Sequence, residues 1–224
     1  MGSEMCIRDR PYIRPLSNIA TVIYFKNFGK RYNNGEKSRE RFSELAKLFD
    51  KSELAAELLA KRDARLVSLK MQLHEAYQGQ ALPTVEFVVP DSANPAKSGD
   101  FLLFGENSMP FYAAKALGLE VVSAQKNDQF GLAQLSSVQL NDLTQGRSMS
   151  VCRFYLSSYV TSSRALPSGS WGEQLGRDCV VDMDYQNAFG GVMSIQYLAE
   201  SLVCLLYTSP SPRDLSTSRM PSSA

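Results

Sequence analysis

After Pro83 the chain alternates between short apolar runs and amphipathic helical patterns, and this alternation restricts its fold more than any other feature. Apolar, largely β-branched or aromatic runs predict strands at residues 84–89, 100–104, 119–124, 148–156 and 178–183. Helical patterns follow at residues 108–118, 136–146, 168–176 and 190–203. We therefore predict an α/β fold with a mostly parallel sheet covered by helices on both faces.

The segment before Pro83 has a different pattern. Residues 19–25 form a short apolar run that predicts one more strand. Two helices follow, the first from residue 38 and the second over residues 53–78, with leucines recurring on one face. If continuous, the second helix is about 39 Å long at 1.5 Å per residue, which is longer than a small sheet needs for cover.

The two ends of the sequence have a different origin from the rest. Residues 204–224 form a Ser/Pro-rich tail, and both this tail and residues 1–10 back-translate to the adapter and transposase-end DNA of sequencing libraries. We expect both segments to be translated adapter and exclude them from fold reasoning. Without them the chain holds 20 basic and 20 acidic residues, a balance that gives no electrostatic argument for nucleic-acid binding.

The sequence contains few candidate metal ligands and no recognisable catalytic motif. His74 is the only histidine, and Cys152 and Cys179 lie far apart, so we expect no metal site. Both cysteines fit small buried residues, and a disulfide between them stays open. No phosphate-binding loop or nucleophile elbow is present, and Asp182 and Asp184 read better as loop-capping residues than as a catalytic base. We predict no enzymatic activity and no resident cofactor.

Aromatic and cationic side chains gather near the predicted strand ends. Phe104 closes one strand, Arg153 and Tyr155 lie near the end of another, and Tyr185 follows the last. Aromatic faces with a guanidinium group suit a bulky, partly apolar, anionic ligand. Each aromatic taken singly is as well explained by core packing. These four residues are our candidate ligand contacts.

In the order of its elements and in several short stretches, the chain resembles the periplasmic substrate-binding proteins of iron-siderophore, haem and vitamin B12 importers. The stretches that carry the resemblance are residues 42–70, 104–122, 135–143 and 166–202. The resemblance implies two α/β lobes joined by one long helix. It divides this chain into the end of an N-terminal lobe (11–36), an interlobe helical segment (37–79) and a C-terminal lobe (80–203).

The resemblance also implies a function. A monomer would hold a ferric siderophore or similar chelate between its lobes and deliver it to the permease of an ATP-driven importer. It would be located in the periplasm or lipid-anchored at the cell surface. One position departs from the pattern: Val138 stands where such proteins usually carry a permease-docking acid, with Asp142 nearby.

Two other functions stay open on the sequence. A metalloenzyme or cofactor-pathway protein with a related α/β lobe would need Cys or His ligands, and Cys152 has none close by in sequence. An interaction domain without a small ligand is also compatible. Metal analysis separates the first from a binding protein, since a tightly bound cluster would identify the enzyme.

Overall fold

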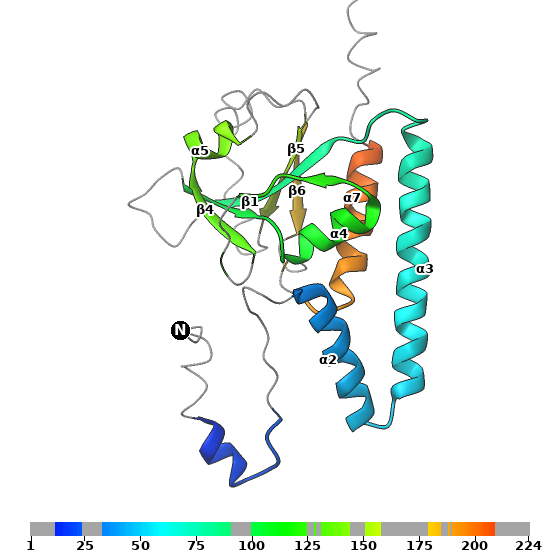
Figure 1. The fold of residues 1–224 in the computed structure, drawn as a ribbon, viewed down its shortest axis with the longest axis vertical. Helices are drawn as coiled ribbons and strands as arrows, with labels where there is room; N and C mark the ends of the chain where they lie inside the picture. Colours follow the sequence, from blue (N-terminus) through cyan, green and yellow to red (C-terminus); the bar gives the residue numbers. More distant parts are fainter. Residues whose placement is uncertain are drawn as a thin grey trace, which may run out of the picture.

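The computed structural model describes residues 12–23, 33–90, 100–124, 128, 131–143, 151–157, 179–184, 188 and 190–208. Figure 1 shows a sheet lobe with helices packed beside it and a helical hairpin that extends below it. The hairpin consists of α2 (Asn34–Leu48) and α3 (Ser52–Ala76). Both predicted helices are confirmed, and 25 residues give α3 a length of about 37 Å.

The sheet is mixed. Its order is β4-β2-β1-β5-β6, with β3 also pairing with β1. The strands are β1 (Thr84–Pro90), β2 (Asp100–Phe104), β3 (Glu120–Val121), β4 (Leu132–Ser136), β5 (Val151–Ser157) and β6 (Cys179–Asp184). β1, β3, β5 and β6 run parallel, whereas β2 runs antiparallel to both β1 and β4. The α/β class is confirmed, with β2 reversed in an otherwise parallel arrangement.

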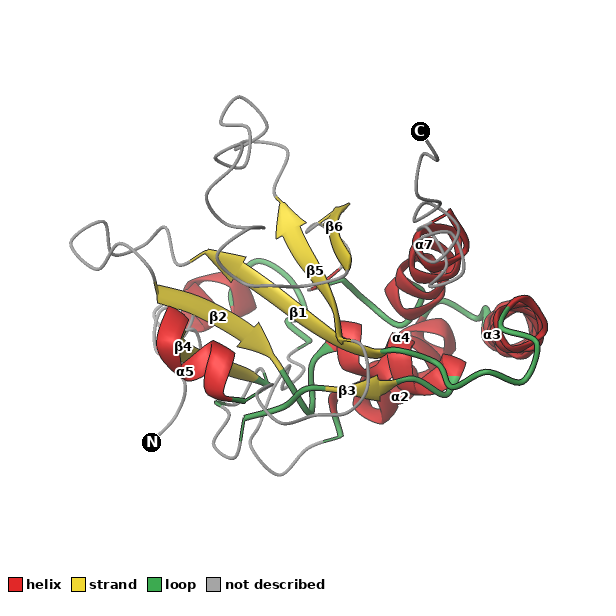
Figure 2. Ribbon diagram, turned by 90° about the horizontal axis from the view of Figure 1, so that it is seen from above, coloured by secondary structure: helices red, strands yellow, loops and turns green. Residues whose placement is uncertain are grey.

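Alternation along the strands divides the core in two. On one face Phe87 and Phe154 lie 5.5 Å apart between ring centroids, and they join the larger cluster with Leu73 of α3. Figure 2 shows α3, α4 (Met109–Leu117) and α7 (Ser194–Thr208) on this side of the sheet. On the other face Val88 joins a smaller cluster with Leu140 of α5 (Ser137–Asp142).

Local sequence explains the ends of α4. Ser108 caps its first turn, since its Oγ accepts a hydrogen bond from the Phe111 amide at 3.3 Å. Pro110 occupies the first turn, where no backbone donor is needed. Gly118 ends the helix with φ of 83°, a conformation that favours glycine.

Three differences from the sequence predictions stand out. Residues 19–23 of the predicted strand 19–25 form no strand, because no strand of the described chain lies beside them to pair with, and residues 24–25 lie outside the described residues. β4 was not predicted.

α7 continues through residues 204–208, and Leu206 is buried, although the translated origin of residues 204–224 stays a prediction. The predicted helix at 168–176 lies outside the described residues.

Candidate functional site

Two of the four candidate ligand contacts have described side chains, and both are buried. Phe104 ends β2 and belongs to the larger core cluster. Arg153 lies in the middle of β5 with no exposed surface, and it alternates with residues of that cluster, so it faces the opposite side of the sheet. The structure therefore does not bring Phe104 and Arg153 to one surface.

The other two candidates are placed only through the backbone or not at all. Tyr155 pairs in register with Val88 on one side and Asp182 on the other. Tyr185 lies outside the described residues, directly after the end of β6. A contact between any of the four and a ligand stays a prediction.

Arg153 has an ionic partner that sequence reasoning missed. Glu86 of β1 lies directly opposite Arg153 in the parallel register, and the Arg153 Nε donates to the Glu86 Oε1. Both side chains have no exposed surface. The Arg153 Nη1 and Nη2 are buried and hydrogen-bond to no residue of the described chain. A buried guanidinium with donors left over is costly, which marks this pair as a feature to be explained.

A signal for this pair was present in the sequence. Glu86 interrupts the apolar run of β1, and Arg153 interrupts that of β5. A charge in the middle of a strand that is buried on both faces needs a partner of opposite sign. Opposite charges in the middle of two predicted strands therefore indicate that Glu86 and Arg153 form an ion pair and that their strands are neighbours.

The loop that follows β2, residues 105–108, forms a polar junction that we call the Asn107 loop. Asn107 adopts φ of 76°, a left-handed conformation that asparagine tolerates. Its Oδ1 accepts hydrogen bonds from the Asn34 backbone amide at 2.8 Å and from the Tyr112 hydroxyl at 2.9 Å. The Asn34 side-chain amide donates to the Asn107 carbonyl at 2.9 Å. The first turn of α2 is thereby fixed to the sheet lobe.

The phenol of Tyr112 is suited to this role. Burial raises the pKa of Tyr112 above its ordinary value of 10.0, although hydrogen bonding near the start of α2 opposes the shift. The hydroxyl therefore stays protonated at physiological pH and donates to Asn107.

The other side of the Asn107 loop is held by backbone contacts. The Gly105 amide donates to the Gly131 carbonyl at 2.8 Å, and the Glu106 amide donates to the Ser123 Oγ at 3.3 Å. Gly131 has φ of 80°, and a Cβ there would lie 2.3 Å from the Glu106 carbonyl oxygen. Only glycine fits this approach. The Asn107 loop is thus a fixed platform that presents the exposed Glu106.

The direction of β2 decides where this platform lies. Because β2 is antiparallel to β1, Phe104 lies opposite Phe87, and the Asn107 loop leaves toward the amino ends of β1 and β5. Ser157 and Asp184 end β5 and β6 at the opposite end of the sheet. Phe104, which was grouped from the sequence with residues near the ends of β5 and β6, therefore leads into a loop at the opposite end of the sheet.

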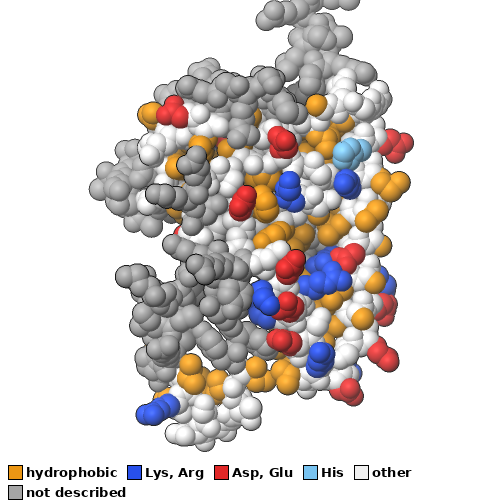
Figure 3. Space-filling view, viewed as in Figure 1, with side chains coloured by type: hydrophobic (Ala, Val, Ile, Leu, Met, Phe, Trp, Pro, Cys, Tyr) orange, Lys and Arg blue, Asp and Glu red, His pale blue; other side chains and the backbone are white. Residues whose placement is uncertain are grey.

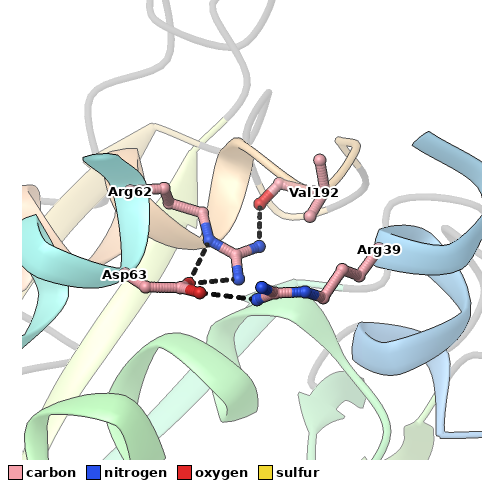
Figure 4. Close-up of polar contacts among 4 residues, drawn as sticks. All are labelled: Arg39, Arg62, Asp63 and Val192. Carbon is pink, nitrogen blue, oxygen red and sulfur yellow. Dashed lines mark hydrogen bonds and ion pairs between the residues drawn. The ribbon is translucent and has the colours of Figure 1, made fainter. Parts of the chain in front are cut away.

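Beyond the sheet, two arginines and one aspartate connect α2, α3 and the turn before α7 (Figure 4). In this arginine–aspartate cluster the Arg62 Nε and Nη2 donate to the Asp63 Oδ1 at 2.9 and 2.5 Å, and the Arg62 Nη1 donates to the Val192 carbonyl at 3.3 Å. The Arg39 Nη1 donates to the Asp63 Oδ2 at 2.6 Å. Partial burial acts to raise the pKa of Asp63, but hydrogen bonds and charge from both arginines outweigh it and lower the pKa.

A cavity of about 460 Å³ adjoins this cluster between α2 and α3, and Arg39, Lys47 and Asp63 contribute to its lining. No residue of the sheet lines it. On this face of the molecule acidic and basic side chains are interspersed among hydrophobic ones (Figure 3). Such a mixed surface does not favour one charge class of partner.

Across the described residues no group of three or more His, Cys, Asp or Glu side chains could hold a metal ion. None of the helices in the described ranges is both long enough and apolar enough to span a membrane. His74 lies in the last turn of α3, where its Nε2 would lie 3.2 Å from a Cβ at Gly118.

Comparison with solved structures identifies the fold. The chain is similar to the siderophore-binding protein FhuD of Vibrio cholerae bound to Fe³⁺–Desferal, with a TM-score of 0.75 and 27% identity over 91% of this chain and 73% of that one. FhuD2 of Staphylococcus aureus with bound ferrioxamine B matches with a TM-score of 0.61 and 11% identity, over 88% of this chain and 72% of that one.

A third match is a FhuD fold-family periplasmic binding protein of a ferrichrome ABC transporter from Bacillus subtilis. Its TM-score is 0.58 and its identity 20%, over 87% of this chain and 70% of that one. No family model and no curated protein matches the sequence. The chain therefore has the FhuD fold, and the resemblance inferred from its sequence is confirmed at the level of structure.

Proposed function

We propose that this chain, which has the FhuD fold, binds a ferric siderophore or similar chelate and passes it to an ATP-driven importer. The observation that carries the proposal is the likeness to the Vibrio cholerae siderophore-binding protein, which extends over nearly the whole chain. The ferric chelate is cargo, and we propose no catalytic step. Two of the similar proteins were solved with an iron-loaded hydroxamate, Fe³⁺–Desferal in one and ferrioxamine B in the other, so we take the hydroxamate class as the first to test.

The direct test is a titration of the full chain with ferric desferrioxamine B, monitored by the fluorescence of Trp171, the single tryptophan. The expected result is saturable quenching, with iron-free desferrioxamine B at least about 100-fold weaker, a difference of about 2.7 kcal/mol. Equal responses to the two compounds, or none beyond that of free tryptophan amide, would contradict the proposal.

The candidate contacts Phe104, Arg153, Tyr155 and Tyr185 belong to the same proposal. For Arg153 two roles can be separated. Arg153→Met alone removes the charge that Arg153 places beside the buried Glu86 carboxylate and should cost about 3–5 kcal/mol of stability. The double variant Glu86→Gln/Arg153→Met removes both charges and should recover most of this loss.

Binding by the double variant then separates the roles. If Arg153 contacts the chelate, the folded double variant loses affinity at least about tenfold, or 1.4 kcal/mol. If the pair serves only the core, the double variant binds as the wild type does. Thermal melting of the same samples confirms that each variant is folded.

Delivery to a permease is proposed on the same likeness. Val138, where similar proteins were expected to carry an acid, is exposed on α5. Asp142 follows four residues later on the same helix and is exposed as well, so one helical turn separates it from that position. We expect Asp142→Asn to weaken binding to the reconstituted importer, and an unchanged affinity would exclude Asp142 from docking.

The cellular location follows from this function. A protein that serves an importer must lie outside the cytoplasmic membrane, in the periplasm or anchored at the cell surface, and we propose that it acts there as a monomer. Fractionation of cells that express the full natural gene tests this directly. Recovery in the cytoplasmic fraction would contradict it.

A further inference from the structure

The structure contains a disulfide-bonded cysteine at the centre of the sheet. Cys152, the second residue of β5, is disulfide-bonded and 1% exposed. It lies in the larger core cluster with Phe154 and Leu156 of the same strand. A covalent link at this point joins the core to another part of the chain, so the identity of its partner matters for the whole lobe.

We infer that the partner of Cys152 is Cys179. The sequence has four cysteines, and Cys204 is exposed and forms no disulfide. The parallel ladder of β5 and β6 places Cys179 directly opposite Cys152. Neighbouring strands lie about 4.8 Å apart, within the range of about 4.4–6.8 Å between Cα atoms that a disulfide spans. Cys6, the remaining cysteine, lies outside the described residues.

The bond attaches an edge strand to the centre of the sheet. In the described sheet β6 pairs only with β5, whereas β5 also pairs with β1. The bond also closes a loop of residues 153–178. Closing a loop of this length restricts the unfolded chain and thereby favours the folded one.

Formation of the bond is an oxidation that requires a partner. The two thiols lose two protons and two electrons by thiol–disulfide exchange with an external disulfide, which is reduced to a dithiol. Such disulfides form and persist in oxidising compartments. The pairing therefore indicates that the chain folds outside the reducing cytoplasm, independently of any ligand that it binds.

Peptide mapping identifies the pairing. The full chain carrying Cys204→Ser is secreted into an oxidising compartment, alkylated under denaturing conditions without reduction, and digested with trypsin. Cys152 then lies in the peptide 148–153, Cys179 in 178–213 and Cys6 in 1–8. We expect 148–153 to be linked to 178–213. Alkylation of both cysteines, or a link between 148–153 and 1–8, would overturn the inference.

Melting curves test what the bond does. With a reductant present the wild type should melt about 10 °C lower, and a Cys6→Ser/Cys204→Ser control should shift equally. The variant Cys152→Ala/Cys179→Ala should melt at the same temperature with and without reductant. A reductant shift that persists in this variant, or one that disappears in the control, would assign the stabilising bond to other cysteines.

Discussion

The two halves of α3 are held in different ways. In its C-terminal half Leu69 and Leu73 are 2% and 0% exposed and pack into the core that α4 and α7 share with the sheet. In its N-terminal half Ala55 and Leu59 are also buried, at 4% and 5% exposed, but they belong to neither core cluster of the sheet lobe, and the helix there faces α2 below the lobe (Figure 1). The C-terminal half therefore packs into the core of the sheet lobe, whereas the apolar residues buried in the N-terminal half lie outside that core, on the part of α3 that faces α2.

Between the two halves stands the arginine–aspartate cluster. Arg62 has an 8% exposed side chain and connects α3 to the turn before α7, while Asp63 connects α3 to Arg39 of α2. The polar contacts thus lie where α3 leaves the core of the sheet lobe. Although α3 is one continuous helix, different contacts stabilise its different parts. We therefore expect substitutions along α3 to lower the free energy of unfolding by different amounts.

The largest effect is expected in the C-terminal half. Leu73→Ala removes a fully buried side chain and should cost about 2–5 kcal/mol in the free energy of unfolding, since the core cannot fully close around the space. Leu54→Ala is the matched control on the same helix and should cost less than about 1 kcal/mol. Denaturant unfolding measures both, and equal losses would contradict the dependence of the loss on the burial of Leu73.

An intermediate effect is expected at the cluster. Arg62→Met keeps the length of the side chain but removes its hydrogen bonds to Asp63 and to the Val192 carbonyl, which should cost about 1–3 kcal/mol. Lys61→Met, at the neighbouring exposed position, is the control and should be within about 0.5 kcal/mol of the wild type. A loss at Arg62 no larger than at Lys61 would show that the cluster adds nothing to stability.

The smallest effect is expected from the charge of Asp63. Its pKa is lowered in the folded chain, so its contribution is present above the ordinary value of about 3.9 and is lost as the pH falls through the folded value. Because the side chain is 40% exposed, solvent screening limits the contribution to less than about 1 kcal/mol. Asp63→Asn should remove this part of the acid destabilisation between pH 5 and pH 2 in parallel melts. An identical pH profile in the variant would exclude the proposed ion pairs.

The sequence predicted secondary structure correctly where one hydrophobic pattern extends over many residues. The leucine spacing of α3 and the apolar run of β1 were predicted correctly because each pattern extends over many residues. β4 was missed because its sequence mixes small and polar residues, and its pairing with β2 supplies what its own pattern lacks.

The site was harder to predict than the fold. Strand direction has no local signature, so the reversal of β2, which directs the Asn107 loop toward the amino ends of β1 and β5, could not be predicted from residues 100–104. Arg153 was treated as lying near a strand end, yet β5 continues to Ser157 and buries it beside Glu86. The contact of Asn34 with Asn107 joins residues that are 73 positions apart, beyond the reach of any periodicity.

The central claim is the proposal that this chain binds a ferric siderophore or similar chelate, with Phe104, Arg153, Tyr155 and Tyr185 as candidate contacts. Hydrogen exchange followed by mass spectrometry, on the full chain with and without ferric desferrioxamine B, tests it most directly. The account predicts that the ferric chelate slows exchange in peptides covering Phe104, residues 153–155 and Tyr185, while the distal turn between α2 and α3 is unchanged. No slowing anywhere, or slowing confined to the α2–α3 turn, would contradict it.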